Sequence, residues 1–255
     1  MLYLIGTGLT AKDISLKSLE IIQRSKKVYL EIYTSKLKEQ LKELEEIYKV
    51  KIHEASRNLL ECTNEIINES INDEISLLII GTPLLATTHT DLLIRAKEHN
   101  VSVNIIHNAS IINVMGCYGL YSYSFGRIIS IPYFEDNWKP TSFYNNIYNN
   151  KINNLHTLCL LDIRVSENEE RFMTPNEALN QLMQCEEIER KGLIELNTEV
   201  FVICRFGTNE EAIYFGSIEE MLCKNFGKPL HSLIIPCKMD VLEREHVNIL
   251  FNAKK

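Results

Sequence analysis

One short run of the chain, ISLLII at residues 75–80, constrains the fold more than any other feature. It is the most apolar stretch of the sequence, it stops at Gly81-Thr82-Pro83, and segments with helical patterns lie on both sides of it. A short strand with apolar side chains on both faces is typical of a parallel sheet that helices cover from both sides. The run therefore predicts the central strand of an α/β domain.

Strand-like and helix-like patterns alternate through the rest of the first half. Short β-rich runs at residues 1–5, 27–33 and 101–106 are separated by segments with apolar residues at helical spacing, such as 16–22 and 35–49. Repeated strand–helix units favour right-handed crossover connections between parallel strands. We therefore expect a parallel sheet in this half.

The sequence changes in character at residues 116–126 (GCYGLYSYSFG), which hold three Gly and three Tyr and show no helical period. We interpret this stretch as an interdomain segment between an N-terminal α/β domain, residues 1–115, and a C-terminal α/β domain, residues 127–255. In the second part, strand-like runs follow one another directly at residues 200–206 and 212–215. Because direct succession is typical of antiparallel neighbours, we expect a mixed sheet there.

Charge and cysteine content exclude several classes of protein. Lys and Arg number 27 against 34 Asp and Glu, a formal net charge of -7, whereas general nucleic-acid-binding domains carry a basic excess. The seven Cys are odd in number and lack C-x-x-C spacing, which argues against a disulfide framework or a metal site and favours reduced, mostly buried thiols. No apolar stretch approaches the ~20 residues of a membrane span, and the N-terminus lacks a secretory signal pattern. We expect a cytoplasmic protein that binds neither membrane nor nucleic acid directly.

Residues suited to ligand binding follow three of the predicted strands. Ligands of open α/β sheets bind beyond the carboxyl ends of the strands, and Gly permits close backbone approach. Ser110 is placed to cap a helix starting at Ile111, whose first N–H groups would face a ligand. The three segments are Gly6-Thr7-Gly8-Leu9, Gly81-Thr82-Pro83-Leu84-Leu85 and His107-Asn108-Ala109-Ser110.

The first of these segments has a competing interpretation. Gly6-x-Gly8-x-x-Ala11 matches the dinucleotide-binding fingerprint, and Glu31 stands where an acid that binds the ribose is expected. The fingerprint, however, needs a helix that opens inside the Gly motif, whereas the helical pattern here begins near Ser15. A tight strand-to-helix turn is the commoner meaning of such a motif.

Five blocks of the sequence, spread from residue 1 to about 236, carry a resemblance to a known family. The blocks are MLYLIGTGLTAKDISLKSLE (1–20), ATTHTDL (86–92), IIHNASIIN (105–113), LHTLCLLDI (155–163) and PLHSLII (229–235). In this order they resemble diphthine synthase, a family of the tetrapyrrole-methylase-like methyltransferases. The resemblance implies a fold of two α/β domains, the first with a parallel and the second with a mixed sheet, and a ligand cleft between them.

The resemblance also implies an activity. The family uses S-adenosyl-L-methionine to methylate the 3-amino-3-carboxypropyl arm of a modified histidine on elongation factor 2, which gives diphthine and S-adenosyl-L-homocysteine in diphthamide biosynthesis. Its members are cytoplasmic homodimers, and eukaryotic members add a further methyl to the carboxylate; residues 136–147 are closer to that branch. Two alternatives stay open: a non-catalytic elongation-factor-binding protein, and a small-molecule methyltransferase of the tetrapyrrole type.

Cofactor contacts can be carried over from the family position by position. Two positions depart from the family pattern G-D-P-F-G, because Thr82 stands in place of the Asp and Leu85 in place of the second Gly. Thr accepts a hydrogen bond without carrying a charge, and Leu fills space that Gly leaves open. The cofactor-binding residues implied by the resemblance are Leu9, Thr82, Leu85, Ser110, Ile111, Leu161, Phe206 and His231.

No residue is assigned a catalytic role, since methyl transfer to an amine is an in-line displacement that needs alignment more than a strong base. An α-amino group titrates near pH ~7.7–8.0 and is partly neutral under ordinary conditions. Asp162 is a candidate to steer the substrate cation or, alternatively, a loop anchor. Aromatic side chains of the interdomain segment suit a growing trimethylammonium or simple core packing; they are Tyr118, Tyr121, Tyr123 and Phe125.

Overall fold

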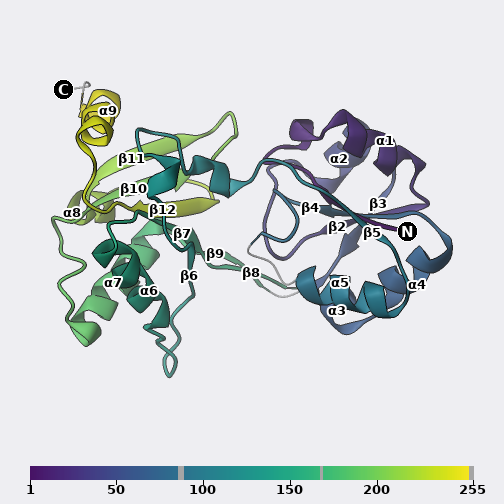
Figure 1. Ribbon diagram of the computed structural model, residues 1–255, viewed down its shortest axis with the longest axis horizontal. Helices are drawn as coiled ribbons and strands as arrows, with labels where there is room; N and C mark the ends of the chain where they lie inside the picture. The colour runs from purple at the N-terminus through teal and green to yellow at the C-terminus, as the bar shows by residue number, and fades with distance from the viewer. Residues whose placement is uncertain (86–88, 167–168, 253–255) are drawn as a thin grey trace. The chain divides into compact units, whose positions relative to one another are not determined.

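The computed structural model describes residues 1–85, 89–166 and 169–252. The chain divides into two compact units (Figure 1). The first unit comprises Met1–Ile111 and Ile163–Glu170, and the second comprises Ile112–Asp162 and Arg171–Lys255. Each unit contains one five-stranded sheet.

The sheet of the first unit is parallel throughout and has the strand order β3-β2-β4-β1-β5. β4 lies in the middle, pairs with both β1 and β2, and has every residue buried, which confirms the prediction from its apolar run. The strands are β1 (Leu2–Gly6), β2 (Lys27–Glu31), β3 (Ile52–Ala55), β4 (Ile75–Ile79) and β5 (Val103–Ile106).

Helices cover both faces of this sheet. Alternate residues of β1 enter two separate cores: Leu2 and Leu4 pack with residues of α3, α4 and α5, whereas Tyr3 and Ile5 pack with residues of α1 and α2. Figure 1 shows the same division of the helices between the two faces. The helices are α1 (Leu16–Arg24), α2 (Leu41–Tyr48), α3 (Arg57–Cys62), α4 (Glu65–Asn72) and α5 (His89–Glu98), and a 3-10 turn, η1, spans Ala11–Asp13.

Two helix predictions for this unit need correction. The helix expected at residues 35–49 is α2, which begins only at Leu41 behind the N-cap Gln40. The helix expected to start at Ile111 is a single 3-10 turn, η2 (Ile111–Val114). At residues 35–49, the apolar residues at helical spacing begin before the first helical residue of α2.

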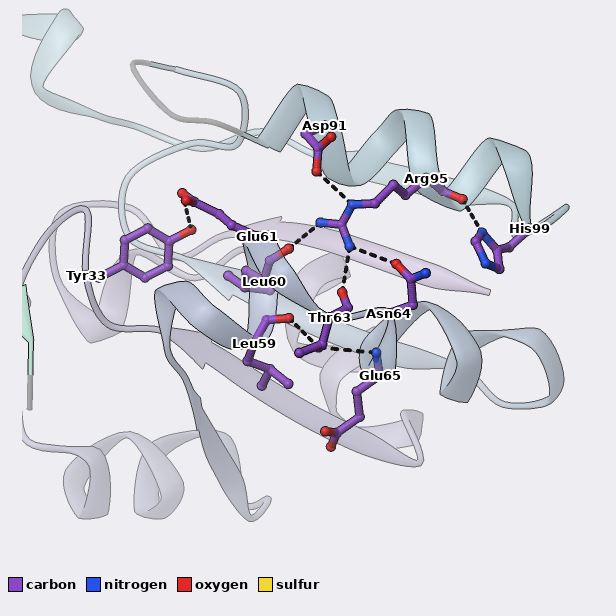
Figure 2. Close-up of polar contacts among 10 residues, drawn as sticks. All are labelled: Tyr33, Leu59, Leu60, Glu61, Thr63, Asn64, Glu65, Asp91, Arg95 and His99. Carbon is purple, nitrogen blue, oxygen red and sulfur yellow. Dashed lines mark hydrogen bonds and ion pairs between the residues drawn. The ribbon is translucent and has the colours of Figure 1, made fainter.

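A single arginine joins three helices on one face of the sheet (Figure 2). Arg95 of α5 donates from Nη1 to the Thr63 carbonyl at 2.6 Å and to Asn64 Oδ1 at 3.0 Å, and from Nη2 to the Leu60 carbonyl. Its Nε donates to Asp91 at 2.7 Å. The carbonyls at the end of α3, which have no partner within their own helix, are thereby satisfied from a neighbouring helix.

The sheet of the second unit is mixed, as the sequence predicts. Its order is β11-β10-β12-β7-β6, with β6 and β7 parallel and the other neighbours antiparallel. The strands are β6 (Ile129–Ile131), β7 (Thr157–Leu161), β10 (Glu199–Cys204), β11 (Ala212–Ser217) and β12 (His231–Ile235). A separate two-stranded sheet is formed by β8 (Ile163–Ser166) and β9 (Glu169–Phe172).

Four helices accompany this mixed sheet. They are α6 (Ser142–Ile152), α7 (Pro175–Glu189), α8 (Ile218–Leu222) and α9 (Val241–Asn252), and a 3-10 turn, η3, spans Ser122–Ser124. Residues of α6, α7 and α8 share one core with the strands. On α9, Phe251 packs edge-on against Phe201 of β10, with ring centroids 5.6 Å apart.

The cysteines are all free thiols, and their burial corrects part of the expectation. Cys159, Cys185 and Cys204 are buried, but Cys62 and Cys223 are exposed. Burial raises the pKa of the Cys204 thiol to about 11, so that thiol is protonated at neutral pH. Within the described part of the chain, no helix combines the length and the apolar character needed to cross a membrane.

Candidate functional site

The carboxyl ends of three neighbouring strands, β4, β1 and β5, form one edge of the first unit, which we call the first edge. Parallel strands end at the same side of a sheet, so segments far apart in the sequence meet there. The structure thereby brings together five of the expected cofactor-binding residues at this edge. These are Leu9 after β1, Thr82 and Leu85 after β4, and Ser110 and Ile111 after β5.

Glycines let the three segments approach one another closely. Beyond the paired strands, Gly8 and Gly81 exchange two backbone hydrogen bonds of 3.1 and 2.9 Å. Both have positive φ, +82° and +80°, which side-chain-bearing residues rarely adopt. A Cβ on Gly6 would stand 2.6 Å from the Gly81 carbonyl oxygen, so no other residue fits there.

The turn after β1 is closed by an aspartate. Asp13 Oδ2 accepts hydrogen bonds from the backbone N–H groups of Leu9 at 3.0 Å and Thr10 at 2.7 Å. A pyrophosphate would need such N–H groups for itself and would be repelled by the carboxylate. The helix that follows, α1, starts at Leu16 behind the N-cap Ser15, as the sequence predicts. The turn is therefore unsuited to a dinucleotide.

The acid of the dinucleotide fingerprint has another partner. Glu31 at the end of β2 is almost fully buried, and one of its carboxylate oxygens lies 2.6 Å from Nε2 of His89. The Thr34 hydroxyl donates to its other oxygen. Because both oxygens are engaged inside the protein, Glu31 does not face a ribose, and the dinucleotide interpretation is wrong on this ground as well.

Asn108 fixes the end of β5 to the turn after β1. Its Nδ2 donates to the carbonyls of Gly6 and Asp13, at 3.0 Å each, and its Oδ1 accepts the N–H of Ala109 at 2.8 Å. All its side-chain atoms therefore serve the shape of the edge. Within the segment His107-Asn108-Ala109-Ser110, Asn108 therefore has a structural role that the sequence did not assign.

The end of β4 is joined to the end of β5 by Thr82. Its Oγ1 accepts the backbone N–H of Asn108 at 3.2 Å and lies 3.1 Å from Nδ1 of His107. Thr82 is partly buried, whereas His107 is exposed. The next residues form a turn in which Leu84 has a φ of +67° and Leu85 is half-buried. Thr82 thus provides a hydroxyl that contacts the two residues directly after β5.

The three remaining expected residues lie at one edge of the second unit, which we call the second edge. Leu161 ends β7, His231 begins β12 beside it, and Phe206 follows β10 on the other side of β12. Since β12 runs antiparallel to both neighbours, its first residue meets their last ones. Leu161 and His231 are buried, and Phe206 is partly exposed.

His231 is a neutral imidazole at this edge. Burial, followed by the nearby charge of Arg205, lowers its pKa from 6.5 to about 4, against a smaller opposing effect of the Gly227 backbone. Its Nδ1 is buried and finds no hydrogen-bond partner among the described residues. Buried polar atoms without partners are rare in native structures and invite a ligand. Arg205, whose influence the sequence did not reveal, donates to the carbonyls of Phe226 and Lys228.

The other candidates have clear structural partners. Asp162 Oδ2 accepts the backbone N–H of Tyr133 at 3.0 Å, which favours its interpretation as a loop anchor. In the aromatic segment, Tyr118 donates to Glu211 and Phe125 packs edge-on against His156, at 5.2 Å between centroids. Tyr123 is 97% exposed, so the four aromatic residues do not form a single packed group.

Two further histidines contact buried carboxylates. His89 contacts Glu31, and the fully buried His156 lies 3.1 Å from Glu243. Glu243 also accepts the N–H of Tyr121 at 2.7 Å, which holds Tyr121 beside the start of α9.

Comparison with known proteins gives one consistent result. The profile of the family Tetrapyrrole (Corrin/Porphyrin) Methylases matches residues 1–222. The chain is 41% identical to the diphthine methyl ester synthase of Dictyostelium discoideum over 272 aligned positions, covering 100% of this chain and 99% of that protein. It is 40% identical to the diphthine synthase of Methanocaldococcus jannaschii, with 98% of each covered. A crystal structure of diphthine synthase superposes with a TM-score of 0.88 at 30% identity, covering 98% of this chain and 96% of the other.

Proposed function

Because the chain belongs to the diphthine synthases, a branch of the tetrapyrrole methylase family, we propose that it methylates the modified histidine of elongation factor 2 in diphthamide biosynthesis. The enzyme is an S-adenosylmethionine-dependent methyltransferase. The observation that carries the proposal is the identity of about 40% with diphthine synthases along essentially the whole chain, both units included.

The residues at the two edges fit S-adenosylmethionine. At the first edge, the buried glycines let the ends of β1, β4 and β5 come close together, which places Ser110 and Ile111 beside the turns after β1 and β4. At the second edge, the buried and unpartnered Nδ1 of His231 is suited to a hydroxyl or a ring nitrogen of a nucleoside. We assign the cofactor to the full set of eight residues: Leu9, Thr82, Leu85, Ser110, Ile111, Leu161, Phe206 and His231.

The chemistry that the cofactor supplies is an electrophilic methyl group on a sulfonium. The protein has to hold the acceptor amine in line with that methyl, and such alignment contributes up to ~7–11 kcal/mol. Rigid edges suit this task, and the first edge is rigid because Asp13, Asn108 and the Gly8–Gly81 bridge bind its three segments together. A neutral His231 would add no positive charge to a site that holds a sulfonium.

Calorimetry and a transfer assay test the proposal. We expect S-adenosylhomocysteine to bind, and labelled methyl from S-adenosylmethionine to be transferred to elongation factor 2 that carries the unmethylated arm. Mass spectrometry of that product counts the methyl groups and separates diphthine from its methyl ester. Binding of the factor without transfer would instead indicate a non-catalytic binding protein. Methyl transfer only to small tetrapyrroles would indicate a small-molecule methyltransferase of the tetrapyrrole type.

The family further suggests a cytoplasmic homodimer. A large apolar surface remains exposed on α9, where Val241, Leu242 and Ile249 are 79%, 60% and 61% exposed. Contiguous exposed apolar side chains mark contact surfaces in many proteins. Light scattering at micromolar concentration checks the assembly, because a mass near the 29.5 kDa of one chain contradicts the dimer.

A further inference from the structure

Most polar donors of the first edge are used within the protein. The backbone N–H groups of Leu9 and Thr10 bind Asp13, and the side-chain amide of Asn108 binds two carbonyls. The backbone N–H groups of Asn108 and Ala109 are also engaged, with Thr82 and with the Asn108 side chain. A ligand at this edge therefore depends on the few donors that the edge leaves available.

His107 is one of these available donors. It directly follows β5, it is exposed, and no described residue contacts its Nε2 atom. Its other nitrogen, Nδ1, lies 3.1 Å from the Thr82 hydroxyl oxygen. The ring is thus held from one side while the opposite nitrogen faces away from that contact.

The hydrogen bonds of Thr82 determine which ring nitrogen carries the proton. A hydroxyl has one proton to donate and two lone pairs to accept. One lone pair of Thr82 accepts the N–H of Asn108, and among the described residues the acceptor within reach of its proton is Nδ1 of His107. When the hydroxyl donates to Nδ1, the proton of the neutral ring is on Nε2.

From this geometry we propose that Thr82 holds His107 in the Nε2–H tautomer, and that His107 donates from Nε2 to a carboxylate of the bound ligand. The second half rests on the proposed function, in which both the cofactor and the acceptor arm carry a carboxylate. A ring already protonated at Nε2 cannot accept a proton there, so His107 is a binding and positioning residue and not a base.

Nitrogen NMR of histidine-labelled protein tests the first half without any ligand. At pH about 8.5, well above the ordinary histidine pKa of ~6.5, we expect His107 to show the Nε2–H tautomer. Thr82→Ser keeps the hydroxyl and should keep this signature, whereas Thr82→Val should let the ring relax to the tautomer mixture of a free histidine. A wild-type signal with the proton on Nδ1 overturns the proposal.

Calorimetry of His107 variants tests the second half. Loss of one hydrogen bond to a charged group weakens binding about 10- to 100-fold. If the cofactor supplies the carboxylate, His107→Leu should weaken the binding of S-adenosylhomocysteine by this factor. The binding of methylthioadenosine, which lacks the carboxylate, should not change. If the acceptor arm supplies it, S-adenosylhomocysteine binding stays unchanged and the KM for elongation factor 2 rises by the same factor. His107→Gln, which retains an N–H donor, should recover part of either loss.

The control variant is His246→Ala, an exposed position on α9. It should alter none of these quantities, and thermal unfolding should show that His107→Leu is folded. Unchanged values in both ligand assays overturn the ligand half. If the wild type binds no S-adenosylhomocysteine at all, the proposed function is wrong, and so is the proposal that His107 binds a ligand carboxylate. The NMR measurement still tests whether Thr82 sets the tautomer of His107.

Discussion

Nε2 of His89 lies 2.6 Å from a carboxylate oxygen of Glu31, and both residues are 2% exposed. Glu31 ends β2 and His89 begins α5, so the contact joins the sheet to the helix that follows the segment after β4. A buried carboxylate is costly unless it is paired, and here Thr34 donates to its second oxygen. The pair holds the start of α5 at a defined place beside the sheet.

Removing one member of this pair should be costly. Glu31→Leu removes the carboxylate that lies 2.6 Å from the buried imidazole of His89, and breaking buried pairs costs about 3–5 kcal/mol. The free energy of unfolding from urea titration measures this loss. The double variant Glu31→Leu/His89→Leu should be more stable than the sum of the single losses implies, because each single variant already loses the same Glu31–His89 contact. Simple additivity would contradict the coupling.

Two glycines of positive φ provide a matched test of the first edge. A Cβ on Gly8 would lie 2.4 Å from Cβ of Asp13, whereas a Cβ on Gly192 meets nothing within 4 Å. Gly192→Ala should cost about 1–2 kcal/mol, the strain of the backbone alone. Gly8→Ala should cost a further ~1–3 kcal/mol for overpacking and should weaken cofactor binding, because Asp13 must move. Equal effects on unfolding would show that the clash is relieved at no cost.

The lowered pKa of His231 predicts how stability depends on pH. The unfolded chain takes up a proton at this residue below pH 6.5, but the folded chain does so only near pH 4, because of burial and then Arg205. Its contribution is therefore fully present above pH 6.5 and is lost as the pH falls toward 4, by at most about 3 kcal/mol. His231→Gln does not titrate and should lose less stability between pH 7 and pH 4. If the free energy of unfolding falls equally with pH in the wild type and in His231→Gln, then His231 is not a buried neutral histidine.

A lysine at position 95 should not replace the stabilising hydrogen bonds of Arg95. Its planar fork reaches two carbonyls and an amide oxygen at the junction of α3 and α4, which a lysine cannot do with a single ammonium group. We expect Arg95→Lys to recover little of the loss caused by Arg95→Ala, about 1.5–3 kcal/mol in unfolding free energy. Lys97→Ala, at an exposed position of the same helix, is the control and should stay within about 0.5 kcal/mol of wild type.

The sequence by itself determined the class of the fold and the position of the first edge. The run at Ile75–Ile79 identified the central strand because burial on both faces favours a nearly continuous apolar run, and its single polar residue, Ser76, is buried with its hydroxyl 2.7 Å from that of Ser25. The glycines after β1 and β4 indicated the close approach that Gly8 and Gly81 make. The beginning of α2 at Leu41 was missed, because an apolar stripe at helical spacing reports which face is buried and not where the helix starts.

Only the tertiary structure decided what the polar residues of the edges do. Asn108 and Asp13 are 95 residues apart, Glu31 and His89 are 58 apart, and Thr82 and His107 are 25 apart. No local pattern links such positions, because a hydrogen bond forms between groups that the strand order brings within about 3 Å. The low pKa of His231 likewise arises from burial at a sheet edge and from Arg205, which reaches it through the pairing of β10 with β12. Residue types follow from the sequence, but protonation and partners depend on what folding places next to them.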